Sequence, residues 1–105
     1  MTLLAVVTTV SSQAEARRLA RALVERDLAA CVQISAIESY YKWDGALQNE
    51  PEFRLVCKTT DERYPAVEQA LRELHSYELP AIFACAVERV FEPYRAWVES
   101  ACQGK

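Results

Sequence analysis

Hydrophobic residues along the chain form two kinds of run, which predict two kinds of element. The segments LLAVV, starting at Leu3, and AIFACAV, starting at Ala81, are short and continuously apolar. Such runs are typical of strands buried within a sheet. Around 12–27 and 59–76, apolar residues recur every three or four positions, which predicts two amphipathic helices. A third, shorter helix is expected to begin at Pro93.

The two longer predicted helices each begin with the spacing of a capping box. Ser12 and Glu15 are three residues apart, and so are Thr59 and Glu62. In this motif the two side chains accept hydrogen bonds from each other's backbone amides. The sequence therefore predicts helices that start just after Ser12 and just after Thr59.

Residues 30–60 alternate in polarity and predict a long β-hairpin with its turn at Asp44–Gly45. The apolar parity changes between Ile34 and Ile37, which predicts a β-bulge near Ser35–Ala36. An extended arm of about fifteen residues spans roughly 45–50 Å. A compact chain of this length has a radius of gyration of only about 13 Å. The hairpin is therefore expected to bend or to project toward another subunit.

The predicted order of elements is β-α-β-β-α-β with a terminal helix, the order of a ferredoxin-like sandwich. The fold class is α+β, and the length favours one domain over residues 1–105. In this topology the last strand lies at an edge of the sheet. An edge as apolar as AIFACAV promotes aggregation unless something covers it. A second, identical subunit is the expected cover.

Composition and charge narrow the classes of partner. The chain is 51% hydrophobic and 26% charged, with a formal net charge of −3. Its basic residues form no stripe, so neither nucleic acid nor an anionic membrane surface is an expected partner. No segment approaches the ~20 apolar residues of a membrane span. The first residues lack the basic region and the long apolar core of a signal peptide. A cytoplasmic protein is the expectation.

The four cysteines do not form a recognisable zinc or redox motif. Cys31, Cys57, Cys85 and Cys102 are far apart, and no CxxC pair occurs. The first three lie within apolar runs, where a cysteine usually packs as a small hydrophobe. Cys31 could act as a nucleophile with His75 as its base. No orienting or oxyanion-hole motif accompanies it, so an enzyme is not expected.

Four motifs, in order and in register, resemble the CutA family of divalent-cation tolerance proteins. They are LAACVQI at the start of the hairpin, SYYKWDG before its turn, CKTT at its end and LHSYELPAI before the last strand. The resemblance extends from about Leu4 to Trp97. It implies a homotrimer held together by long hairpins, with clefts between subunits as in PII-type signalling proteins. It also implies a role in tolerance of copper and other divalent metals.

The resemblance also implies which residues form the site. His75 is the expected ligand of a weakly or transiently bound divalent metal, Cu²⁺ above all. The further candidates are Glu52, Glu78 and Cys31 as additional ligands, and Tyr41, Trp43, Lys58 and Tyr77 as residues of the intersubunit cleft. Two residues depart from the family pattern. Thr8 stands where some members have a cysteine, and Ser76 stands where the family usually has a proline.

Several alternatives remain open from the sequence. His75 could close the preceding helix, bind metal, or transfer protons near neutral pH. Glu52 and Lys58 could form a surface ion pair, and Tyr41 and Trp43 could serve subunit packing alone. For the whole protein, metal binding is the first hypothesis. A regulatory or scaffolding trimer with a small molecule or protein partner in its clefts is the second, and a cleft enzyme using His75 and Lys58 is the third.

Overall fold

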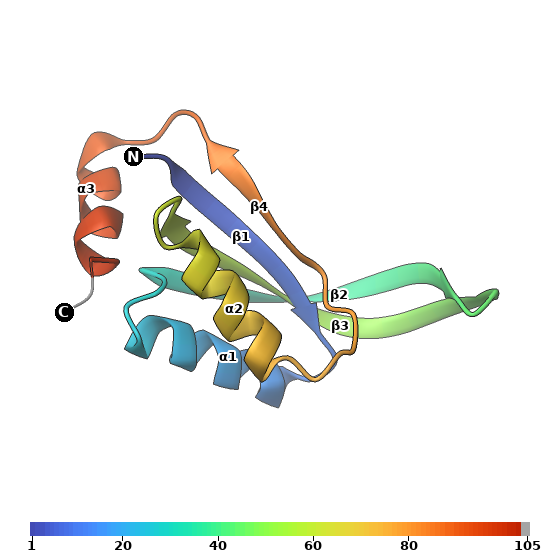
Figure 1. Ribbon diagram of the computed structural model, residues 1–105. Coiled ribbons are helices and arrows are strands. Elements are labelled where there is room, and N and C mark those ends of the chain that lie inside the picture. Colours follow the sequence, from blue (N-terminus) through green and yellow to red (C-terminus); the bar gives the residue numbers. More distant parts are fainter. Residues whose placement is uncertain (104–105) are drawn as a thin grey trace.

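The computed structural model describes residues 1–103 as a four-stranded antiparallel sheet with three helices (Figure 1). The elements are β1 (Leu3–Val10), α1 (Gln13–Glu25), β2 (Cys31–Trp43), β3 (Ala46–Thr60), α2 (Tyr64–Leu74), β4 (Ile82–Val87) and α3 (Glu92–Ala101). The strand order is β2-β3-β1-β4, so β2 and β4 are the two edges. The predicted α+β class and the order β-α-β-β-α-β with a terminal helix are confirmed.

Helices α1 and α2 cover one face of the sheet, and the core lies between them and the strands (Figure 1). Val6 and Leu55 contribute the strand side of this core, and Leu19 and Leu71 contribute the helix side; all four are fully buried. These residues lie at alternate positions on the strands and at helical spacing on the helices, as the periodicity predicts. We call this side of the sheet the covered face.

The other side of the sheet, which we call the open face, has no helix across its centre within residues 1–103. Val7 lies there between Val56 on β3 and Phe83 on β4. Phe83 is 51% exposed. Helix α3 packs only at one end, where Val98 and Cys102 contact Leu3. In the described part of the chain, the sheet therefore has one packed side and one apolar side that no helix covers.

The β2–β3 hairpin extends beyond the helices, at the opposite end of the molecule from α3 (Figure 1). Its turn has Asp44 at φ 54° and Gly45 at φ 78°. Two consecutive positive φ angles match the twist of a two-residue hairpin, so the predicted Asp-Gly turn is confirmed. The molecule measures 45 × 27 × 21 Å, with a radius of gyration of 14.3 Å. This radius of gyration exceeds the value of about 13 Å expected for a compact chain of this length, so the molecule is elongated.

The predicted β-bulge near Ser35–Ala36 is wrong. The pairing of β2 with β3 runs without a break from Cys31 opposite Lys58 to Trp43 opposite Ala46. The apolar parity changes because the strand passes from one environment to another. Val32 packs against the helix-covered core, whereas the later odd-numbered apolar positions belong to the open face beyond the helices.

Only one of the two predicted capping boxes forms its N-cap. Ser12 Oγ accepts a hydrogen bond from the Glu15 amide at 3.1 Å, as predicted. The predicted reciprocal bond does not form, because the Glu15 carboxylate accepts from Ser76 instead. Thr59 instead belongs to β3 and pairs with β1, and its hydroxyl donates to the Leu28 carbonyl at 2.7 Å. Strand pairing with β1 continues through Thr60 and prevents a helix from starting there. Helix α2 begins four residues later without a side-chain cap.

Candidate functional site

A hollow of about 590 Å³ lies where the β2–β3 hairpin meets the segment after α2. We call it the hairpin pocket. Its lining residues are Thr9, Ser39, Tyr40, Tyr41, Trp43, Gln48, Glu52, Tyr77, Glu78, Leu79 and Ala81. Its volume is within the usual range for small-molecule sites, about 300–1,000 Å³. Of the residues expected in the cleft, Tyr41, Trp43 and Tyr77 line it, and so do the expected ligands Glu52 and Glu78.

Glu52 is the central polar group of the hairpin pocket. It lies on β3 opposite Ile37 and is only 7% exposed. Ser39 Oγ donates to its Oε1 at 2.5 Å, and the Tyr77 hydroxyl donates to its Oε2 at 2.6 Å. A buried carboxylate needs such donors, and these two hold it in one orientation. Burial and the hydrogen bond to Glu52 raise the pKa of Tyr77 above its ordinary value of 10.0, so its hydroxyl stays a donor even in mildly alkaline solution.

His75 lies next to this pocket with a fully buried side chain. Its Nε2 donates to the Thr9 carbonyl at 2.8 Å, and its Nδ1 accepts from the Tyr77 amide at 3.1 Å. These partners fix the neutral tautomer that has its proton on Nε2. His75 is also the C-cap of α2, with its amide bonded to the Leu71 carbonyl. In the isolated protomer, a metal ion could reach Nδ1 only by displacing the Tyr77 amide.

Glu15, expected from the sequence only as the partner of Ser12 in a capping box, anchors the same loop from the other side. Glu15 is 8% exposed, and the Ser76 amide and hydroxyl donate to its two oxygens at 2.9 and 2.8 Å. Its Oε2 lies 3.9 Å from His75 Nδ1. A proline at position 76 could not donate the amide bond. One signal was available: Glu15 lies four residues before Leu19, on the apolar stripe of α1.

Cys31 and Lys58 lie away from the hairpin pocket. They face each other across the β2–β3 pairing, six positions along β3 from Glu52. Six residues of strand correspond to about 20 Å. Lys58 Nζ donates to Gln33 Oε1 at 3.3 Å and makes no ion pair with Glu52. Within one protomer, the structure therefore separates these two predicted site residues from the other candidates.

Comparisons with known proteins place these residues in a family. The family model of the CutA1 divalent ion tolerance protein matches residues 4–101. The chain belongs to the CutA1 family. The divalent-cation tolerance protein CutA of Archaeoglobus fulgidus is 35% identical over 95 residues, which is 90% of this chain and 93% of that protein.

Solved CutA structures share the fold over nearly the whole chain. CutA from Synechococcus elongatus PCC7942 superposes with a TM-score of 0.95 at 40% identity, covering 97% of this chain and 91% of that chain. The structure described as the periplasmic divalent cation tolerance protein CutA from Archaeoglobus fulgidus gives a TM-score of 0.94 at 33% identity, covering 98% and 100%. The resemblance to the CutA family seen in the sequence is confirmed.

The family name raises the question of whether this CutA1 chain can hold a divalent cation by itself. Among residues 1–103, no three His, Cys, Asp or Glu side chains lie close enough together to hold a metal ion. Glu52 and Glu78 supply oxygen donors to one pocket, which suits a cation in charge but is an incomplete ligand set. None of the helices within 1–103 is long and apolar enough to cross a membrane.

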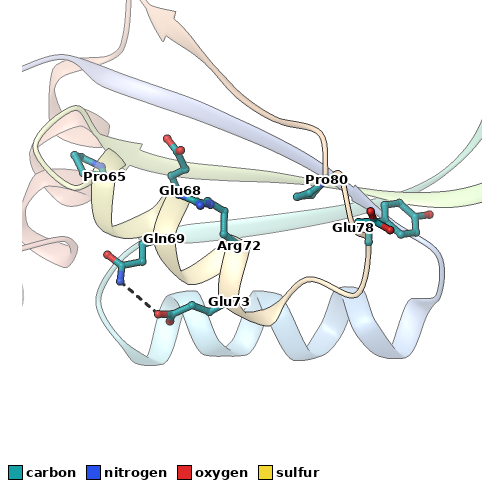
Figure 2. A pocket seen from close by; sticks show the side chains of 8 residues that line it. Pro65, Glu68, Gln69, Arg72, Glu73, Glu78 and Pro80 are labelled. Atoms are coloured by element: carbon teal, nitrogen blue, oxygen red, sulfur yellow. Dashed lines mark hydrogen bonds between the residues drawn. The ribbon is translucent and has the colours of Figure 1, made fainter.

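A second hollow of about 630 Å³, the helix groove, lies between α2 and the segment that follows it (Figure 2), and it shares Tyr77 and Glu78 with the hairpin pocket. Its lining residues are Pro65, Glu68, Gln69, Arg72, Glu73, Tyr77, Glu78 and Pro80. Gln69 Nε2 donates to Glu73 Oε2 at 3.3 Å (Figure 2). Arg72 places a positive charge among the three glutamates of this groove. The hairpin pocket has no such charge, which makes it the stronger candidate for a cation.

Proposed function

We propose that this chain forms a homotrimer that binds divalent cations, Cu²⁺ in particular, in clefts between subunits and contributes to metal-ion tolerance. The observation that carries the proposal is the charge of the hairpin pocket. Glu52 and Glu78 line it, and none of its lining residues is a lysine, an arginine or a histidine. Two carboxylates without a cationic side chain produce a negative potential that attracts cations.

The surfaces left without a partner support assembly. Within residues 1–103, both edge strands of the sheet lack a further strand, and one of them, β4, presents Phe83. On the hairpin, Leu47 is 69% exposed. The accessible surface is 6696 Å², compared with about 6,000 Å² for a folded monomer of this mass. Apolar edges and patches of this kind are typical of subunit interfaces.

The ligand set supports a site that is completed by assembly. One protomer offers Glu52 and Glu78, and a second subunit would supply the remaining donors. Among divalent first-row metals, Cu²⁺ generally binds nitrogen, oxygen and sulfur sites most tightly, which favours copper. His75 and Cys31 stay predicted ligands, and His75 would have to exchange its bond with the Tyr77 amide for the metal. The role requires no catalytic step.

A cytoplasmic location is part of the same proposal. The four cysteines are all unpaired, and Cys85 is exposed. Free exposed thiols persist most readily in a reducing compartment. The Archaeoglobus fulgidus relative is described as periplasmic. The compartment of this chain should therefore be measured directly, by cell fractionation.

The test is a Cu²⁺ titration of the full chain followed by electron paramagnetic resonance, after light scattering has established the mass. Wild type, Glu52→Gln, Glu78→Gln and His75→Ala are compared, with Glu25→Gln as a matched control on the exposed surface of α1. We expect a trimer with a saturable copper site that is weakened by Glu52→Gln and Glu78→Gln and unchanged by Glu25→Gln. Loss of nitrogen hyperfine coupling in His75→Ala would identify His75 as a ligand.

Two results would contradict the proposal. A monomeric mass would remove the intersubunit cleft. Copper binding that is equally strong in Glu52→Gln, Glu78→Gln and wild type would move the metal away from the hairpin pocket.

A further inference from the structure

We propose that the hairpin pocket binds small organic ammonium ions, with the rings of Tyr41, Trp43 and Tyr77 around the cation and the Glu52 carboxylate as its counter-charge. This inference rests on the proposed preference of the pocket for cations, but it requires no metal. It names a ligand class that the walls of the pocket suit better than they suit a bare metal ion.

The aromatic side chains give the first argument. Tyr41 and Trp43 occupy alternate positions of β2, so their side chains leave the same side of the strand. They are 42% and 52% exposed, and Tyr77 approaches from the loop after α2. The face of an aromatic ring is negative and attracts an ammonium group within about 6 Å of its centre. Such rings supply no ligand atom for a divalent metal except a tyrosine oxygen.

The buried carboxylate gives the second argument. Ser39 and Tyr77 each donate one hydrogen bond to Glu52, one to each oxygen. An ionised carboxylate can accept about four hydrogen bonds, so capacity remains for an N–H donor or for simple charge pairing. Because the two bonds already fix the orientation of the carboxylate, little ordering is needed when a ligand enters. Glu78 adds a second negative charge at the same pocket.

The size and the apolar lining give the third argument. A volume of about 590 Å³ is far larger than one metal ion requires. Leu79 and Ala81 add apolar wall beside the aromatic rings. Methyl or methylene groups on a cation would bury apolar surface against these residues, which a hydrated metal ion cannot do. The pocket thus combines apolar walls with a few convergent polar groups, as small-molecule sites usually do.

The same chemistry could come from a lysine or arginine side chain of another copy of this chain. We favour the free small molecule, because the rings and the carboxylate line the same hollow within one protomer. An intrinsic side chain of another subunit would occupy the pocket permanently. The two sources therefore differ in whether an added ammonium ion can bind.

The probe is tetramethylammonium, titrated into the full chain in the presence of a metal chelator. In a Trp97→Phe background, Trp43 is the single tryptophan and therefore the single source of the signal. This substitution should not disturb the pocket, because Trp97 lies on α3 at the other end of the molecule. We expect a saturable change in Trp43 fluorescence and a matching heat by calorimetry. Neutral tert-butanol, which has nearly the same shape, should produce neither. No saturable binding of tetramethylammonium, including the case of a pocket filled by another subunit, overturns the inference.

Two variants examine the two halves of the site, with calorimetry as the readout. Trp43→Leu keeps the wall apolar but removes the ring, so tetramethylammonium should bind about two- to thirtyfold more weakly. Glu52→Gln should weaken the binding of tetramethylammonium, and tert-butanol should again give no response. Trp97→Leu is the matched control and should have no effect. Equal affinity in Trp43→Leu and wild type would overturn the assignment of the ring.

The tetramethylammonium titration and the copper titration can fail separately. Binding of tetramethylammonium under chelation, together with no copper binding, would retain this inference and remove the proposed metal role. Copper binding without tetramethylammonium binding would do the reverse.

Discussion

Two leucines on β3 show how differently the two ends of this strand are used. Leu55 is fully buried in the core beneath the helices, whereas Leu47, eight residues earlier, is 69% exposed near the hairpin turn. The strand is continuous and regularly paired with β2 through both positions. The covered end therefore stabilises the fold, and the hairpin end provides surface for association and for the hairpin pocket.

The largest expected effect is a loss of stability on substitution at the covered end of β3, with little change on the same substitution at its hairpin end. Leu55→Ala should lower the free energy of unfolding by about 2–5 kcal/mol, because it leaves a cavity in the core. Leu47→Ala should change it by no more than about 0.5 kcal/mol at protein concentrations where the subunits are dissociated, because the side chain is then mostly in water. Urea unfolding at one protein concentration measures both. A large loss for Leu47→Ala would mean that another subunit buries the hairpin.

A second pair of variants sharpens the comparison within the covered face. Within residues 1–103, the buried hydroxyl of Thr8 has no hydrogen-bond partner, whereas that of Thr59 donates to the Leu28 carbonyl. Thr8→Val should stabilise the protein by about 1 kcal/mol, since it removes an unsatisfied polar group. Thr59→Val should destabilise it by about 1–3 kcal/mol, since it leaves a carbonyl unpaired.

Thermal unfolding measures this pair, since 1 kcal/mol corresponds to about 4–8 °C in a domain of this size. The same substitution should thus move the two melting temperatures in opposite directions. A destabilised Thr8→Val would show that the hydroxyl does have a partner in solution.

The smallest expected effect concerns the hairpin end and appears only at high pH. The pKa of Tyr77 is raised above its ordinary value of 10.0 by burial and by the hydrogen bond to Glu52. The folded chain therefore keeps this proton when the unfolded chain loses it. The resulting stability should be complete below pH 10 and decline as the pH rises toward the folded-state pKa.

Unfolding of wild type and Tyr77→Phe between pH 8 and 11 measures this contribution. The difference between the two proteins should be constant below pH 10 and should change above it. A difference that stays constant throughout would show that Tyr77 is not protected by Glu52.

Residues with local signals were the ones that sequence analysis predicted well. Ser12 caps α1 because its partner, the Glu15 amide, is three residues away. Asp44 and Gly45 form the turn because both can adopt positive φ. The predicted cap at Thr59 was wrong because pairing with β1, far away in sequence, overrides the local pattern. The predicted bulge was wrong because the change in apolar parity marks a change of environment along a regularly paired strand.

At the site, too, sequence analysis predicted the candidate residues but not their contacts with distant segments. Tyr41, Trp43, Glu52, Tyr77 and Glu78 were candidates from the sequence, and the fold brings all five to one pocket. The roles of Glu15 and Ser39 could not be predicted, because their partners lie 61 and 13 residues away. No periodicity or spacing encodes such a contact.

The sequence by itself determined the types of element, their order, the position of the hairpin turn and the family. Each of these follows from residues close together in the chain or from motifs in a fixed order. Only the tertiary structure decided that the hairpin pairs without a bulge, and it alone decided the buried bonds of His75 and the contact of Glu52 with Tyr77. These depend on packing between segments far apart in sequence, where burial and hydrogen-bond satisfaction select one arrangement among many.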